Sequence, residues 1–80
     1  NMTARPKLNR IKDVLDARGS SQTWLAKQLN RDFSTVNGYC SQRFQPSLTT
    51  LFRISQILCC KYQDLIANPY EDDKNNQNNE

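Results

Sequence analysis

The sequence predicts an all-α fold, a compact domain of five helices, and three observations support this prediction. Apolar residues recur at three- and four-residue intervals along most of the chain, as on one face of a helix, and no useful stretch shows the alternation of a strand. Glycine, proline and short polar runs divide this pattern into brief segments. A chain of 80 residues can bury only one small core, so the segments should pack as a single domain.

The first two helices should be separated by Gly19. The first is expected from Leu8 to Arg18, because glycine readily adopts the left-handed conformation that ends helices. Its apolar stripe consists of Leu8, Ile11, Val14 and Leu15. The second should begin after the Ser20-Ser21 pair, which offers an N-cap. Its apolar residues are Trp24, Leu25, Ala26 and Leu29.

The second and third helices should meet at a tight turn. The polar run at residues 30–32 interrupts an otherwise continuous helical pattern, and Asp32 can cap the third helix. Asn30 is expected in the left-handed region, which asparagine tolerates better than most residues. Ala26 would allow the two helices to approach closely, and Val36 would close the corner against Leu25 and Leu29. The apolar face of the third helix consists of Val36, Tyr39 and Cys40.

Two more helices are expected after Gln45-Pro46. Ser47 should cap a longer fourth helix, which is apolar on nearly half of its circumference and should therefore lie nearest the core. It carries Leu48, Leu51, Phe52, Ile54, Ser55, Ile57 and Leu58. A short fifth helix should run from Tyr62 to Ala67, before Asn68-Pro69 ends it.

This arrangement resembles the helix-turn-helix of the lambda-repressor/Cro-like (XRE-type) DNA-binding domains. In that family a Gln opens the second helix, followed by a small residue four positions on, a Gly eight on and an aliphatic residue fourteen on. The matching residues here are Gln22, Ala26, Asn30 and Val36. The segment QPSLTTLFRISQIL also resembles the Asn-Pro-Ser-Leu stretch leading into the family's fourth helix. The resemblance covers Leu8 to Ala67 and implies a compact five-helix lambda-repressor-like domain.

The chain departs from the family pattern at three places. Asn30 replaces the usual Gly of the turn, and Ser41-Gln42 stand where relatives often have Asn-Gly, so that loop is expected to be wider or less tightly turned. Gly38 lies inside the third helix, where glycine costs about 1 kcal/mol relative to alanine. It would either allow a close approach of the backbone to DNA or simply be tolerated in a short exposed helix.

The resemblance implies that the third helix lies in the major groove, with its N-terminal residues at the base edges. The base-reading residues would be Phe33, Ser34, Asn37 and Gly38. Asn37 can bond adenine N6 and N7 together, Ser34 can donate or accept, and Phe33 can contact a thymine methyl. Two alternatives stay open, since Asn37 could be an ordinary solvated residue and Phe33 could fold back onto Tyr39 or Phe44 as part of the core.

Phosphate contacts should flank the third helix, because they fix the register without reading sequence. The candidates are Gln22, Thr23, Lys27, Arg31, Arg43, Ser47 and Thr49. The first two open the second helix, and Ser47 and Thr49 open the fourth, where backbone N–H groups and the helix dipole favour an anion. Arg43 follows the third helix, where the family often has a basic residue. For Lys27 and Arg31 simple solvation is the alternative.

Charge is distributed unevenly along the chain. Residues 1–70 carry ten Lys or Arg and four Asp, a net +6, whereas residues 71–80 carry one Lys and four acidic residues, a net −3. A basic body suggests a polyanionic partner, although a solvated surface is the alternative. The tail EDDKNNQNNE has no apolar residue to offset its ordering entropy. We therefore expect a flexible arm over residues 1–7, a DNA-binding domain over 8–67 and a disordered, acidic and Asn-rich tail over 68–80.

Catalytic and metal chemistry are poorly supported. The chain has no histidine for a Cys/His nucleophile pair and no Gly-rich phosphate loop, so we expect neither an enzyme nor a cofactor. Three cysteines without a fourth ligand make a poor zinc site. Cys60 is expected to act as a small buried hydrophobe, with a redox sensor as the alternative. An odd number of thiols and no apolar run of about 20 residues predict a cytoplasmic protein without a membrane span.

The expected function is sequence-specific binding of double-stranded DNA by a transcriptional regulator, a repressor acting as a homodimer. The alternative is a protein-interaction module of the same fold, such as an antitoxin or anti-repressor whose main partner is a protein. The charge around the third helix discriminates between them, because a basic rim favours DNA and an acidic or apolar rim favours a protein.

Overall fold

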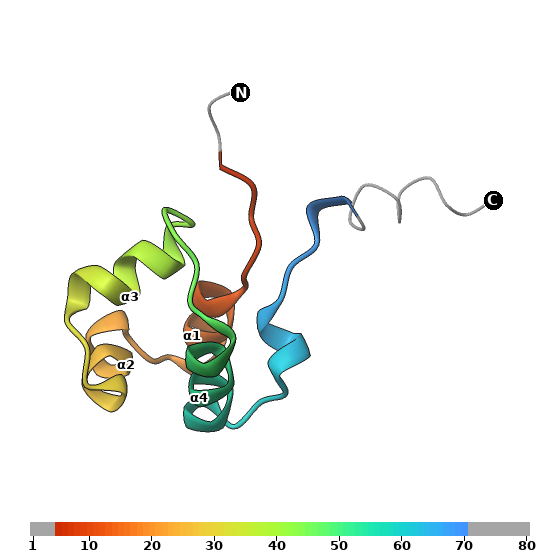
Figure 1. The fold of residues 1–80 in the computed structure, drawn as a ribbon. Helices are drawn as coiled ribbons and strands as arrows, with labels where there is room; N and C mark the ends of the chain where they lie inside the picture. Colours follow the sequence, from red (N-terminus) through yellow and green to blue (C-terminus); the bar gives the residue numbers. More distant parts are fainter. Residues whose placement is uncertain (1–4, 71–80) are drawn as a thin grey trace.

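The computed structural model describes residues 5–70, which form four α-helices followed by one 3-10 turn (Figure 1). The elements are α1 (Ile11–Arg18), α2 (Gln22–Leu29), α3 (Phe33–Cys40), α4 (Leu48–Leu58) and the 3-10 helix η1 (Tyr62–Leu65). The predicted all-α class is confirmed. The predicted count of five helices is slightly wrong, because the fifth element is a single 3-10 turn and not an α-helix reaching Ala67.

A backbone pairing between the two ends of the described chain explains why both terminal helices are shorter than predicted. Asn9 and Ile66 form an isolated antiparallel bridge. The Arg10 N–H donates to the carbonyl oxygen of Leu65 at 2.8 Å. Residues that pair in this way need extended backbone. The first helix therefore begins at residue 11 and not at residue 8, and η1 stops before residue 66.

The turn between α2 and α3 has the predicted geometry. Ser21 caps α2, since its side-chain oxygen accepts a hydrogen bond from the Trp24 N–H at 3.0 Å. Asn30 ends α2 in the left-handed region, with φ 59° and ψ 44°, and the N–H of the following residue donates to the Ala26 carbonyl at 2.9 Å. Ala26 and Val36 are both buried, as their roles at the corner require.

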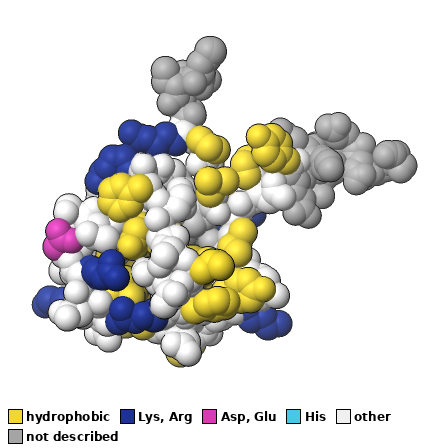
Figure 2. Space-filling view, in the orientation of Figure 1, with side chains coloured by type: hydrophobic (Ala, Val, Ile, Leu, Met, Phe, Trp, Pro, Cys, Tyr) yellow, Lys and Arg dark blue, Asp and Glu magenta, His cyan; other side chains and the backbone are white. Residues whose placement is uncertain are grey.

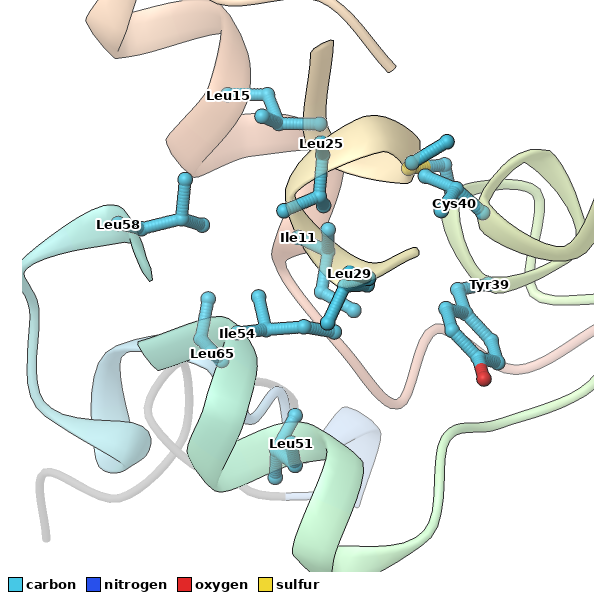
Figure 3. Close-up of a cluster of buried hydrophobic side chains, with 12 residues drawn as sticks. Ile11, Leu15, Leu25, Leu29, Tyr39, Cys40, Leu51, Ile54, Leu58 and Leu65 are labelled. Carbon is cyan, nitrogen blue, oxygen red and sulfur yellow. The ribbon is translucent and has the colours of Figure 1, made fainter. Parts of the chain in front are cut away.

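One hydrophobic core receives side chains from all five elements (Figure 3). Helices α1 and α2 each supply two side chains that are less than 2% exposed, and α3, α4 and η1 supply one each. These residues are Ile11, Leu15, Leu25, Leu29, Val36, Ile54 and Leu65. Burying such a side chain contributes roughly 1.5–3 kcal/mol, so this cluster is the main source of stability for the helix arrangement.

Part of the apolar face predicted for α4 lies outside this core. Leu51, Ile54 and Leu58 are buried as expected, but Leu48 and Phe52 are 65% and 46% exposed. The Phe52 ring instead packs edge-on against the ring of Tyr62, with centroids 4.9 Å apart. Leu48 lies one helical turn before Phe52, on the same side of α4. We refer to these three exposed side chains, Leu48, Phe52 and Tyr62, as the apolar patch.

A buried polar cluster joins the segment before α1 to the loop after α3. Asn9 is only 3% exposed. Its side-chain amide donates to the Tyr39 carbonyl at 2.9 Å and to Gln45 Oε1 at 2.8 Å, and its Oδ1 accepts from the Ile11 N–H at 3.0 Å. Gln42 completes the cluster, because its Nε2 donates to the Asn9 carbonyl at 3.0 Å. Periodicity and composition had indicated no role for Asn9.

The loop that follows α3 is turned more tightly than expected. Gln42 adopts a left-handed conformation with φ 66°, which glycine adopts more readily than residues with a side chain. The N–H of Arg43 donates to the carbonyl of Gly38 at 2.9 Å, which closes the turn. Side-chain bonds from Gln42 to the backbone of residues 8 and 9 hold this conformation. The substitution of Ser41-Gln42 for Asn-Gly has therefore not widened the loop.

The cysteines differ in environment. Cys40 is buried in the core, and its burial raises the pKa of the thiol to about 11. Cys60 is half-buried and packs against the core, as expected of a small hydrophobic side chain. Burial also raises the pKa of its thiol. Cys59 is exposed and ends α4 in the left-handed region.

Other predictions concern residues that the structure describes only in part. Residues 5–7 and 68–70 are the described portions of the predicted arm and tail, and residues 1–4 and 71–80 lie outside the described range. Within residues 5–70, no three His, Cys, Asp or Glu side chains are grouped closely enough to hold a metal ion. No helix in this range combines the length and the apolar character needed to cross a membrane.

Candidate nucleic-acid interface

Helix α3 presents one polar and aromatic face to solvent. Its buried face is formed by Val36, Tyr39 and Cys40, as predicted. Phe33 is 50% exposed and Ser34 is exposed, while Asn37 is half-buried between the two faces. The aromatic pair in this region joins Tyr39 to Phe44, with ring centroids 5.6 Å apart. Phe33 is therefore available on the surface and does not fold back as a core residue.

Asn37 is held by a hydrogen bond from the preceding helix. Its Nδ2 donates to Oε1 of Gln22, the first residue of α2, at 3.0 Å. An Asn amide nitrogen carries two hydrogens, so the second hydrogen and the Oδ1 acceptor stay available. These two groups match the N7 acceptor and N6 donor that adenine presents in the major groove. The structure thus couples two residues that the sequence had suggested for different tasks.

Gly38 has a packing role that was not expected from the sequence. The residue is buried, and the ring of Phe44 lies directly against its Cα. A Cβ atom at this position would lie 2.2 Å from Phe44 Cζ and 2.5 Å from Cε2. A side chain at this position would therefore displace the Phe44 ring from its place against α3. Gly38 thus packs against Phe44, and its place beside the base-reading residues stays a prediction.

Gly38→Ala should affect stability in opposite directions depending on residue 44. In the native chain the new methyl group expels the Phe44 ring, and we expect a loss of about 1–2 kcal/mol in the free energy of unfolding. In a Phe44→Ala background the space is open, and the better helix propensity of alanine should raise stability by up to about 1 kcal/mol. Denaturant unfolding of the four proteins measures this cycle. The same sign in both backgrounds would contradict the packing argument.

The predicted phosphate-binding residues of α2 lie along one exposed edge. Thr23 and Lys27 are exposed and one helical turn apart, so they share this edge. Gln22 lies at the first position of the helix, where backbone N–H groups have no partner within the helix. Arg31 is exposed immediately after the Asn30 turn. Of these residues, Gln22 contacts α3 through Asn37, and Arg31 lies two positions before α3.

The predicted phosphate-binding residues that follow α3 differ in their exposure and in their hydrogen bonds. Arg43 is exposed, and its guanidinium carbon lies 5.7 Å from the centre of the Phe44 ring, which restrains the side chain. Thr49 is exposed in the first turn of α4. Ser47 has a different role, because its oxygen accepts from the Thr50 N–H and its hydroxyl donates to Thr50 Oγ1, both at 3.1 Å. The Ser47 hydroxyl thus caps α4, and its contact with a phosphate stays a prediction.

Basic and apolar side chains gather in different areas of the face drawn in Figure 2. In Figure 2 most of the Lys and Arg side chains in view gather over the side built by α2 and α3, whereas the larger apolar area lies over the side of α4. An acidic residue, Asp32, lies at the N-cap of α3. Its carboxylate accepts hydrogen bonds from the hydroxyls of Thr35 and Ser34. These bonds hold the pKa of Asp32 below its ordinary value.

Comparison with known proteins now decides the family. A family model of Cro/C1-type helix-turn-helix DNA-binding domains matches residues 10–69, which is three quarters of the 80-residue chain. The chain belongs to this family. The Cro/C1-type domain is thus a DNA-binding domain, and the resemblance found in the sequence is confirmed.

A solved structure supports the same fold. It belongs to a protein from Bacteroides fragilis that is provisionally described as DNA-binding. The two chains are 37% identical and superpose with a TM-score of 0.74, over 75% of this chain and 97% of the other. No curated protein matches this Cro/C1-type domain.

Two features of the candidate interface were missed from the sequence alone. The Gln22 to Asn37 bond joins residues 15 positions apart, so no local pattern could indicate it. The bond from Ser34 to Asp32, at 2.9 Å, spans only two residues. An Asp at an N-cap followed by hydroxyl residues is a common local motif, and this second feature could have been predicted.

Proposed function

We propose that this Cro/C1-type domain regulates transcription by binding specific double-stranded DNA with α3 in the major groove. The observation that supports this best is the Gln22 to Asn37 hydrogen bond beside the exposed Phe33 and Ser34. A side chain fixed in this way loses little further entropy on binding, and its remaining donor and acceptor fit adenine. Asn37 would read adenine, Ser34 a neighbouring base and Phe33 a thymine methyl group.

Phosphate contacts would hold α3 in register. We assign them to Thr23 and Lys27 on the edge of α2, to Arg31 after the turn, and to Arg43 in the loop after α3. Gln22 would add the Nε2 donor of its amide, because its Oε1 is used by Asn37. Thr49 and the backbone N–H groups at the start of α4 would contact phosphate on the opposite side of α3.

We further propose that the protein binds as a homodimer and acts as a repressor. The apolar patch of Leu48, Phe52 and Tyr62 supports a protein contact, since these side chains are exposed outside the core. Two domains related by a two-fold axis would read two half-sites. Repression needs only occupation of the site and no additional contact with the transcription machinery.

Binding is expected to depend steeply on salt. Each phosphate that a basic or polar group neutralises contributes about −0.9 to the slope of log K against log salt. Five to eight such contacts in a dimer would give a slope of roughly −5 to −7. The measurement is a binding titration on a DNA fragment recovered by selection from random sequences, repeated at several salt concentrations. A slope near zero would contradict the DNA-binding assignment of this surface.

A protein-interaction module of the same fold is the second candidate. The apolar patch and the negative charge of Asp32 beside α3 are the observations that favour it. The basic side chains around α2 and α3 favour DNA over this alternative (Figure 2). Selection from random DNA discriminates between the two, because a protein-interaction module would recover no common sequence.

A further inference from the structure

The carboxylate of Asp32 lies at the start of α3, beside residues that the proposed function places at the bases. Asp32 precedes the first helical residue and is exposed. Its Oδ2 is 2.9 Å from the Ser34 hydroxyl oxygen, and its Oδ1 is bonded to the Thr35 hydroxyl. Both hydroxyls therefore point their hydrogens toward the same side chain.

The protonation of Asp32 decides the direction of these bonds. The hydroxyl of Thr35, and next the hydroxyl of Ser34, keep the pKa of the carboxyl group below its ordinary value. An ionised carboxylate can only accept hydrogen bonds. Ser34 must therefore be the donor in its contact with Asp32, and its single hydroxyl hydrogen is used there. What Ser34 can still offer to a third group is the lone pairs of its oxygen.

This restriction has a consequence for base recognition. We propose that Asp32 makes Ser34 an acceptor-only reader, so that the base facing it carries an amino group in the major groove. The bases of this kind are adenine, through N6, and cytosine, through N4. Guanine and thymine present only acceptors, with the methyl group of thymine, at that edge and would be disfavoured. Asp32 is thus a specificity-determining residue that acts through Ser34, and the inference rests on the proposed function.

Selection from random DNA with the full chain tests this inference. The position read by Ser34 is defined as the one whose preference disappears in Ser34→Ala. In the wild type we expect adenine or cytosine there. A site carrying purine, which lacks the 6-amino group, in place of adenine should bind at least about fivefold more weakly.

Asp32→Asn provides the second arm. The Asn side chain can donate to the Ser34 oxygen, which frees the hydroxyl hydrogen for a base acceptor, so guanine and thymine should enter the selected set. In the Asp32→Asn/Ser34→Ala double variant, this position should behave as in Ser34→Ala alone. Asp16→Asn removes the same charge from the exposed side of α1 and serves as the control, with the base preference unchanged.

Several outcomes would overturn the inference. These are guanine or thymine opposite Ser34 in the wild type, an unchanged preference in Asp32→Asn, or an effect of Asp32→Asn that persists without the Ser34 hydroxyl. In each of these cases a preserved preference at the base read by Asn37 would leave the proposed function standing. If selection with the wild-type protein recovered no common sequence, both the proposed function and this inference would be overturned.

Discussion

Asn37→Ala is expected to abolish the base preference at one position per half-site while leaving the salt dependence of binding unchanged. Asn37 is hydrogen-bonded to Gln22, and in the proposed complex it would offer one donor and one acceptor to an adenine, a contact that discriminates by about 1–3 kcal/mol. It carries no charge and should neutralise no phosphate. Binding-site selection and a salt titration on the wild type and the variant measure the two quantities. Identical base preferences in both proteins would remove Asn37 from the reading residues.

Arg43→Ala is the matched contrast to this change. Its guanidinium is exposed and restrained against Phe44, where a phosphate contact is proposed. Its loss should weaken binding to all sequences about equally and make the salt slope shallower by about one unit per subunit. If Arg43→Ala instead lost affinity for some sequences and not for others, the roles of the two residues would have been exchanged.

Gln22→Ala extends the test to the orientation of Asn37. Removing the acceptor at 3.0 Å frees the Asn37 amide to rotate, so the same base position should lose preference, though by less than in Asn37→Ala. In a two-fold symmetric dimer, the affected position should appear twice, about 10 base pairs apart or a multiple of that. A loss of preference at another position in Gln22→Ala would show that the two side chains act separately.

Asn9→Ala should produce the largest loss of stability among the polar substitutions considered. Its amide satisfies the Tyr39 carbonyl and the Ile11 N–H inside the protein, and both would be left without this partner. We expect the free energy of unfolding to fall by about 2–3 kcal/mol. For a domain of this size the midpoint of thermal unfolding should fall by roughly 10–20 °C.

Calorimetry and denaturant unfolding would measure this loss. Gln28→Ala is the control, because Gln28 is an exposed amide on α2 and its replacement should change stability by less than about 0.5 kcal/mol. A loss as small as that in Asn9→Ala would mean that the buried cluster contributes no net stability. Base preference should be unchanged in Asn9→Ala, since Asn9 belongs to the buried polar cluster and not to the exposed face of α3.

Local features of the fold could be predicted because they depend on neighbouring residues. The Ser21 cap, the left-handed Asn30 and the buried face of α3 each follow from a few adjacent side chains and the geometry of one helix turn. Gly19 likewise ends α1 in the left-handed region, as expected. The family followed from the same local spacing, since the turn and its flanking helices occupy one continuous stretch.

The features that were missed or predicted wrongly depend instead on residues that are distant in the chain. Helix α1 is short because the backbone of Asn9 pairs with Ile66, a residue 57 positions away, and is not helical. The spacing of apolar residues along the chain cannot indicate such a distant pairing. The packing of the Phe44 ring against Gly38 was missed because nothing in the local sequence pattern indicates it. Phe52 belongs to an apolar helix, yet it lies outside the core, where its ring packs against Tyr62, ten positions further along the chain.

The sequence by itself therefore determined the helical class, the helix-turn-helix and the set of polar residues from which an interface could be built. Only the tertiary structure decided which of these residues act together. It joined Gln22 to Asn37, used the Ser47 hydroxyl as a cap and buried Asn9 as a structural residue. The physical reason is that helix formation depends on contacts three or four residues apart, whereas the partners of a polar side chain are selected by packing between segments distant in the chain.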